Sequence, residues 1–90
     1  IHFMKIVIYS SLLCPYCVAA KALLKKLKLE YNEILIDNKP TVKEQMIKLS
    51  KRKTVPQIFF GKRHVGGYDD LQKLHRDYDI KKILNEKKKD

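Results

Sequence analysis

Two cysteines that stand two residues apart are the residues of this sequence best suited to chemistry. Cys14 and Cys17 are the only cysteines in the chain, and they flank Pro15 and Tyr16. Two intervening residues in a first helical turn bring two sulfur atoms within bonding distance. One thiolate can then attack a disulfide, and the second can release the product from the mixed disulfide that forms. The spacing therefore predicts a dithiol redox site.

The two sulfurs are expected to play different roles. Cys14 precedes the predicted helix and lies at the positive end of its dipole, so it is the candidate nucleophile. Cys17 lies one turn inside the helix and is the candidate resolving thiol. Pro15 suits the first helical position, where its missing N–H would have no partner anyway. The backbone amides of Tyr16 and Cys17 are candidate donors to the Cys14 sulfur.

Two cysteines at this spacing can also bind zinc or form a structural disulfide. Zinc needs four ligands, and only His2, His64 and His75 could join the cysteines, none of them at a finger-like spacing. A structural disulfide across a four-residue loop would stabilise the fold little. We therefore favour redox chemistry and expect no metal.

The elements that must position the pair follow from hydrophobic periodicity. Short apolar runs rich in β-branched residues predict strands, and apolar residues at helical spacing predict helices. The expected strands are 4–9, 31–37, 55–60 and 63–65, and the expected helices run from 15 to about 28, from 40 or 41 to about 51, from near 68, and from 80 to about 87. The predicted fold is α/β, with the order β-α-β-α-β-β-α-α.

This order also predicts the sheet. The first half is a βαβ unit, so its strands should be parallel, whereas the turn at Gly61-Lys62 makes an antiparallel hairpin. We expect a four-stranded mixed sheet flanked by helices. Asp79 is expected to cap the last helix. The expected inward-facing residues of the first two helices are Ala20, Leu23, Leu24, Leu27, Val42, Met46 and Leu49.

Length and composition indicate one folded domain over residues 1–90. The apolar fraction of 44% is ordinary for a globular protein. We find no apolar run of about 18–20 residues and no signal peptide, and we expect a cytoplasmic monomer without an obvious apolar patch. Met4 is a candidate initiator, which would make residues 1–3 a non-native extension. Residues 87–90 are expected to form a frayed basic tail.

The formal charge of +10 raises the possibility of nucleic-acid binding. Seventeen of the 20 basic residues are lysines, and they are dispersed along the chain. Specific base recognition favours arginine, so we rank a nucleic-acid-binding module below the redox site. Positive charge would instead attract an anionic substrate.

Two further segments stand out for their backbone chemistry. Pro56 cannot donate within a strand, so it occupies either a trans strand-start position or a cis turn that leaves Val55 free to pair with an extended ligand. Gly66 and Gly67 precede a predicted helix start, where free N–H groups can bind a carboxylate. Taken alone, that second segment favours a plain turn with an Asp cap.

Taken together, the three segments carry a resemblance. Cys-Pro-Tyr-Cys at 14–17, Thr-Val-Pro at 54–56 and Gly-Gly-Tyr-Asp-Asp at 66–70, in this order and spacing, are similar to those of bacterial dithiol glutaredoxins. The resemblance covers about residues 4–84. It implies a thioredoxin-like fold with Pro56 in cis. It also implies reduction of protein disulfides and glutathione mixed disulfides, with glutathione as the reducing co-substrate.

The resemblance also implies site residues for glutathione. Tyr16 would flank its sulfur, and Thr54, Val55 and the adjoining Pro56 would hold its peptide backbone. Its γ-glutamyl end would meet the start of the third helix, with the Asp70 carboxylate facing the amine. That end would be held by Gly67, Tyr68, Asp69 and Asp70, and Lys43 is a further candidate for the glycyl carboxylate.

One departure from the family pattern stands close to the cysteines. Many members carry a lysine three residues before the first cysteine, and this chain has Ser11 there. We expect a less acidic Cys14 or weaker glutathione binding than in a lysine-bearing relative. An iron–sulfur carrier is an alternative function, which Pro15 disfavours because related cluster-binding members have a smaller or polar residue there. The expected protein partners are disulfide-containing or glutathionylated proteins, ribonucleotide reductase among the compatible ones.

Overall fold

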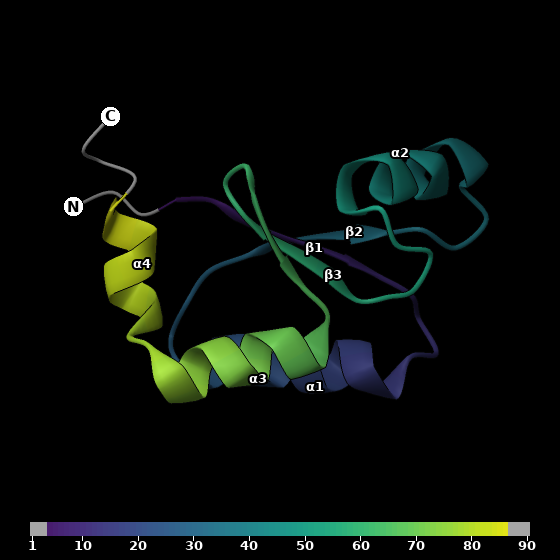
Figure 1. The fold of residues 1–90 in the computed structure, drawn as a ribbon. Coiled ribbons are helices and arrows are strands. Elements are labelled where there is room, and N and C mark those ends of the chain that lie inside the picture. The colour runs from purple at the N-terminus through teal and green to yellow at the C-terminus, as the bar shows by residue number, and fades with distance from the viewer. Residues whose placement is uncertain (1–3, 87–90) are drawn as a thin grey trace.

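The protein is described by a computed structural model that covers residues 4–86. The predictions for residues 1–3 and 87–90 lie outside this range. Eight elements follow one another in the predicted order (Figure 1). They are β1 (Ile6–Ser10), α1 (Pro15–Lys26), β2 (Asn32–Leu35), α2 (Pro40–Ser50), β3 (Gln57–Phe60), β4 (Arg63–Gly66), α3 (Tyr68–Asp77) and α4 (Ile80–Glu86).

The four strands form one mixed sheet in the order β2-β1-β3-β4. Strands β1 and β2 are parallel, while β3 pairs antiparallel with both β1 and β4. The predicted parallel βαβ unit and antiparallel hairpin are therefore confirmed. The hairpin contains an irregularity, since Ile58 pairs with Gly66 but Phe59 pairs with His64. The fold has the thioredoxin-like architecture expected from the sequence.

Helices cover both faces of this sheet. In Figure 1, α1 and α3 lie on one side and α2 lies on the other. Successive side chains along a strand point to opposite faces of the sheet, so the strands contribute to one apolar cluster on each face. The cluster beneath α1, α3 and α4 contains Ile8, Leu24 and Phe60, while the cluster beneath α2 contains Tyr9, Met46 and Phe59. Both faces are therefore sealed, and the ends of the strands remain for a functional site.

The second helix is the one whose inward face was partly mispredicted. Met46 is fully buried and Val42 packs against the same cluster, but Leu49 is 52% exposed. Positions 42, 46 and 50 lie four residues apart and share one face, so Ser50 takes the inward position that we expected of Leu49. The Ser50 hydroxyl donates to the Arg52 carbonyl oxygen and accepts from the Arg52 N–H, both over 3.1 Å, which allows it to be buried.

The remaining local predictions concern caps and the proline. The Asp79 carboxylate accepts a hydrogen bond from the Lys81 N–H at the start of α4, which confirms the predicted cap. Pro56 lies one residue before β3, and the Val55–Pro56 bond is cis, as the family resemblance implied. Within residues 4–86, no helix combines the length and the apolar character that crossing a membrane would need.

Candidate active site

The two cysteines lie at the N-terminus of α1, and both are free thiols. Cys14 has an extended backbone and caps the helix, with its Sγ accepting a hydrogen bond from the Cys17 N–H over 3.2 Å. This confirms one of the two predicted amide donors. The Cys14 thiol in turn lies 3.7 Å from the carbonyl oxygen of Val55, to which it can donate. The second cysteine is fully buried, whereas Cys14 is only half-buried.

This difference in burial separates the chemistry of the two sulfurs. Burial, followed by the hydrogen bond with Cys14, raises the pKa of Cys17 to about 12. Cys17 therefore stays protonated near neutral pH. The partly accessible sulfur at the helix N-terminus receives an N–H donor and is the one that a substrate can reach.

A groove of about 310 Å³ opens beside the cysteines. Its walls come from three places in the sequence: the first turn of α1, the segment before β3 and the start of α3. The rings of Tyr16 and Tyr68 stand 6.3 Å apart on its side. The lining residues are Tyr16, Arg52, Thr54, Val55, Pro56, Gly67, Tyr68, Asp69 and Asp70. Neither cysteine is itself a lining residue, but Tyr16 lies between the two in the sequence and the Val55 carbonyl oxygen lies 3.7 Å from the Cys14 sulfur. A larger hollow of about 910 Å³ near Met4 and Leu84 is lined by none of these three segments.

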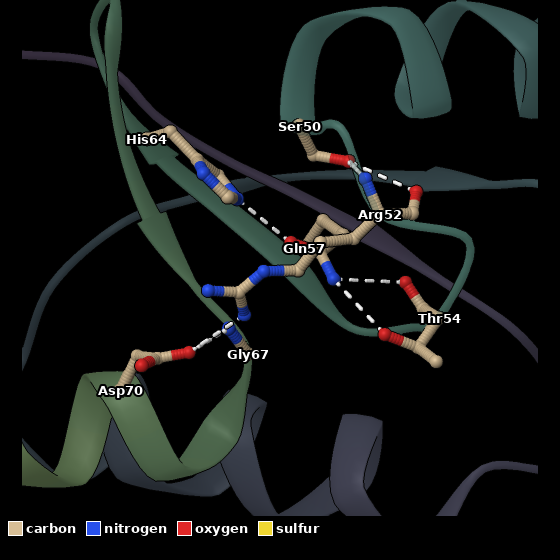
Figure 2. A network of polar contacts seen from close by, with 7 residues as sticks. All are labelled: Ser50, Arg52, Thr54, Gln57, His64, Gly67 and Asp70. Atoms are coloured by element: carbon tan, nitrogen blue, oxygen red, sulfur yellow. Dashed lines mark hydrogen bonds and ion pairs between the residues drawn. The ribbon is translucent and has the colours of Figure 1, made fainter.

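Asp70 ties one wall of the groove together. Its Oδ2 accepts hydrogen bonds from the Gly67 N–H and from the Arg52 guanidinium, each over 2.9 Å (Figure 2). These bonds, that from Arg52 first, lower the pKa of Asp70, so the carboxylate stays charged at neutral pH. The first amides of α3 have no partner within the helix, which leaves the Tyr68 and Asp69 N–H groups available to a bound carboxylate.

A second network holds the segment before β3. The Gln57 side-chain Nε2 donates to the Thr54 carbonyl oxygen over 3.0 Å and to Thr54 Oγ1 over 3.2 Å, and Gln57 Oε1 meets His64 Nε2 over 2.7 Å (Figure 2). Since a carbonyl can only accept, the amide orientation is fixed, and His64 must carry a proton on Nε2. Burial is the main cause that lowers the pKa of His64, so the ring is neutral at pH 7.

The structure brings most of the predicted site residues together. Eight of the nine predicted glutathione-binding residues line the groove, and the ninth, Lys43, does not; it is exposed on α2. Sequence reasoning missed Arg52, Gln57 and His64. A polar residue within the apolar run that forms β3 was the available signal for Gln57, because a buried amide needs partners.

The family resemblance points to a lysine in many members at position 11, where this chain has Ser11. Ser11 donates from its hydroxyl to Asp37 Oδ1 over 2.6 Å, and the Leu12 N–H donates to Asp37 Oδ2 over 2.9 Å. The bond from Ser11, followed by that from Leu12, lowers the pKa of Asp37. A carboxylate in the turn that follows β2 therefore anchors the loop that leads to Cys14.

One expectation about the surface is wrong. The sequence suggested no obvious apolar patch, yet the side chains of Leu12, Leu13, Tyr16 and Val18 are all more than half exposed beside Cys14. They fall in a loop and on the outer face of a first helical turn, where neither cluster of the core reaches them. This removes the reason given for expecting a monomer.

The zinc alternative depended on histidines that could join the two cysteines as ligands. His64 is engaged by Gln57, and His2 lies outside the described residues. Among residues 4–86, no three His, Cys, Asp or Glu side chains form a group that could hold a metal ion.

The sheet order, the dithiol at a helix N-terminus and the adjoining groove define a thiol-disulfide oxidoreductase with the thioredoxin-like fold. The family model named Glutaredoxin matches residues 6–65. The chain is 49% identical to glutaredoxin 3 of Escherichia coli over 67 residues, which are 74% of this chain and 81% of that protein. The chain belongs to the glutaredoxin family.

Solved structures agree with this assignment. The solution structure of a glutaredoxin from Brucella melitensis is similar with a TM-score of 0.80 and 41% identity, over 91% of this chain and 89% of that one. A buckwheat glutaredoxin in complex with glutathione is similar with a TM-score of 0.83 and 29% identity, over 92% of this chain and 78% of that one. These relatives favour the redox hypothesis over the zinc and nucleic-acid alternatives.

Proposed function

We propose that this protein is a glutathione-dependent disulfide oxidoreductase that acts in the cytoplasm on glutathione mixed disulfides and protein disulfides. The observation that carries the proposal is the asymmetry of the two thiols beside the groove. Cys14 is accessible and receives the Cys17 N–H, whereas Cys17 is buried with a pKa of about 12. Cys14 is therefore suited to attack a substrate disulfide, and Cys17 is suited to remain protonated until it resolves the mixed disulfide.

The monothiol route needs only Cys14. Its thiolate attacks the glutathione sulfur of a mixed disulfide, so a Cys14–glutathione disulfide forms and the former partner leaves as a thiolate that takes a proton from solvent. A second glutathione thiolate then attacks the bound glutathione sulfur. Oxidised glutathione leaves, and Cys14 returns as a thiolate. Overall, one glutathione is consumed as the reductant, and the glutathionyl unit removed from the mixed disulfide leaves as the other half of oxidised glutathione.

The dithiol route adds Cys17. When Cys14 holds a protein through a disulfide, the charge and the hydrogen bond that it presents to Cys17 as a thiolate are gone, and two of the causes that raise the Cys17 pKa are removed. Cys17 loses its proton and attacks Cys14, which forms the internal disulfide and releases the reduced protein as a dithiol. Two glutathione molecules then reduce the internal disulfide.

The groove offers partners for each end of glutathione. Tyr16 would flank the sulfur, and the peptide groups of Val55, which precedes β3, would pair with the cysteinyl unit. The free amides at the start of α3 would bind the γ-glutamyl carboxylate, and Asp70 would face the amine through Oδ1. Thr54 lies alongside, with its hydroxyl hydrogen free to donate because Oγ1 already accepts from Gln57.

Two cations are candidates for the glycyl carboxylate. Arg52 lines the groove, and its side chain is 47% exposed, so a guanidinium face remains for a ligand beside the bond to Asp70. Lys43 is the candidate from the family resemblance, but it lies outside the groove lining. We therefore favour Arg52. The buckwheat structure, which contains glutathione, supports the ligand class.

The test is turnover of a small glutathione mixed disulfide coupled to glutathione reductase, with wild type, Cys14→Ser and Cys17→Ser. We expect Cys14→Ser to abolish turnover. Cys17→Ser should keep it while losing reduction of a protein disulfide. Wild-type protein that turns over neither substrate would refute the proposal, and a Cys14→Ser variant with full activity would refute the assignment of the nucleophile.

A further inference from the structure

The exposed apolar side chains of the described residues are concentrated around the nucleophile. Six large hydrophobic residues are exposed in residues 4–86, and four of them fall between positions 12 and 18. Leu13, directly before Cys14, is 96% exposed and Leu12 is 67% exposed. Val18 is 57% exposed one turn further on. Scattered apolar residues need no explanation, but a group of them marks an interaction site.

The position of Leu13 makes its exposure unusual. Leu13 and Val18 stand just before the cap and at the fourth position of α1, where apolar residues often pack against each other and fix the entry of the chain. Here Leu13 is almost fully open to solvent, so this contact does not cover it. The side chains of Leu13 and Val18 therefore remain accessible to an external partner.

The loop that carries the leucines is held in place. Both oxygens of the Asp37 carboxylate accept hydrogen bonds from it, one from the Ser11 hydroxyl and one from the Leu12 N–H. Two bonds to one carboxylate restrain two successive residues. The leucines are therefore presented outward from an anchored loop.

The surface made by Leu12, Leu13 and Val18, called here the leucine surface, is separate from the groove. None of its three residues lines the groove, whereas Tyr16, which lies between Leu13 and Val18 in the sequence, does line it. In the proposed reaction, glutathione fills the groove, so the protein that shares its disulfide must lie outside. The exposed side chains nearest to Cys14 along the chain and outside the groove are those of Pro15 and of the leucine surface.

We propose that the leucine surface docks the protein half of the substrate and selects protein cysteines flanked by apolar side chains. The inference rests on the proposed function and names its substrate class. Bond making and breaking follow the monothiol route above: the peptide leaves as a thiolate and takes a proton from solvent. The leucine surface contributes only contact with the residues beside the modified cysteine.

The test uses two uncharged peptides, each glutathionylated on one cysteine, that differ only in whether leucine or serine flanks that cysteine. Values of kcat/KM are measured for wild type, for the double variant Leu12→Ser/Leu13→Ser and for Leu49→Ser, an equally polar change at an exposed leucine on α2. Because the replaced residues are exposed, folding is preserved, and thermal unfolding verifies this. The mixed disulfide of glutathione and 2-mercaptoethanol, which has no flanking residues, serves as the common reference substrate.

We expect wild type and Leu49→Ser to favour the leucine peptide by about tenfold, the ratio that corresponds to roughly 1.4 kcal/mol from partial leucine burial. The double variant should favour it by less than about twofold and keep wild-type activity on the reference substrate. Equal rates for the two peptides with wild type, or a preference that survives in the double variant, would overturn the inference. A dimer that the double variant disperses, with no change in peptide preference, would assign the surface to a second copy and also overturn it. Wild type inactive on the reference substrate would instead refute the proposed function.

Discussion

The Gln57 side chain is bonded twice to Thr54, through the carbonyl oxygen at 3.0 Å and the hydroxyl at 3.2 Å. The two residues flank the Val55–Pro56 bond, so the Gln57 side-chain amide bridges the two ends of the turn at residues 54–57. Replacing Gln57 with leucine should remove both of these hydrogen bonds to Thr54 while Cys14 stays unchanged. We expect Gln57→Leu to raise KM for a glutathione mixed disulfide about fivefold, which corresponds to ~1 kcal/mol of lost hydrogen bonding, with kcat changed by less than about twofold.

The matched control for this prediction is His64→Leu. His64 belongs to the same network, where its side chain is hydrogen-bonded to Gln57 over 2.7 Å and its ring packs against Phe59, so its loss leaves both bonds to Thr54 in place. KM for His64→Leu should stay within about twofold of wild type. Similar KM values for the two variants would mean that Gln57 acts through general stability and not through the position of Thr54.

Gly66 is predicted to be far less replaceable than its neighbour Gly67. Its φ is +121°, and a Cβ added there would lie 2.6 Å from Asp70 Cγ, which would push the carboxylate away from Arg52 and from the Gly67 N–H. Gly67 has a φ of −91°, and its nearest contact would be the Pro56 carbonyl oxygen at 3.4 Å. We expect Gly66→Ala to lower the free energy of unfolding by about 1–3 kcal/mol, and Gly67→Ala by clearly less. Urea unfolding of the two variants measures this, and equal losses would contradict it.

The sequence alone predicts the elements and the reactive pair because both depend on local spacing. A Cys-x-x-Cys before a helix places its own sulfurs, and the βαβ order fixes the direction of the first two strands. The hydrogen bonds that hold the groove residues in place were missed, because they join residues that are distant in the sequence and that only the fold brings together. Arg52 and Asp70 are 18 residues apart, and Gln57 reaches His64 across the β3–β4 hairpin.

Leu49 and Leu13 illustrate the other limit of sequence reasoning. Leu49 fits a helical apolar pattern, but a serine with two backbone bonds takes the buried position beside it. Leu13 lies in a loop, where periodicity carries no information on exposure. Whether such a side chain is covered depends on the path of the loop, and here that path is set by Asp37 in the turn that follows β2.

The two thiols should differ strongly toward alkylation in the folded, reduced protein. Cys17 is fully buried, and with a pKa of about 12 only about one molecule in ten thousand is in the thiolate form at pH 8. We expect iodoacetamide at pH 8 to give a single adduct on Cys14, seen by peptide mass spectrometry. Cys14→Ser should stay nearly unlabelled, because burial remains the main cause of the raised Cys17 pKa. Unfolding in urea should expose both sites, whereas equal labelling of both cysteines in the folded protein would contradict their assigned difference.

The Lys21–Glu33 ion pair should contribute stability over a defined pH range. Lys21 Nζ lies 2.7 Å from Glu33 Oε2, which also accepts from the buried Ser10 hydroxyl. The bond from Lys21, followed by that from Ser10, lowers the pKa of Glu33 below 4.5, and the bond to Glu33 raises the pKa of Lys21 above 10.5. A lowered carboxyl pKa stabilises the fold above pH 4.5, and this contribution is lost as the pH falls through the folded-state value; a raised amine pKa stabilises it below pH 10.5, and this is lost as the pH rises through the folded-state value.

Glu33→Gln tests this window because the amide oxygen can still accept from Ser10 while the charge is removed. We expect the variant to lose about 0.2–1 kcal/mol of unfolding free energy at pH 7, the range for partly exposed pairs, and less at pH 3, where wild type has lost part of the same contribution. Urea unfolding at the two pH values measures the difference, and 0.5 M salt should reduce it. Glu30→Gln, an exposed acid that makes no ion pair within residues 4–86, is the matched control and should show no such dependence. A loss in Glu33→Gln that is the same at pH 3 and pH 7 would mean that the carboxylate contributes through packing and not through its charge.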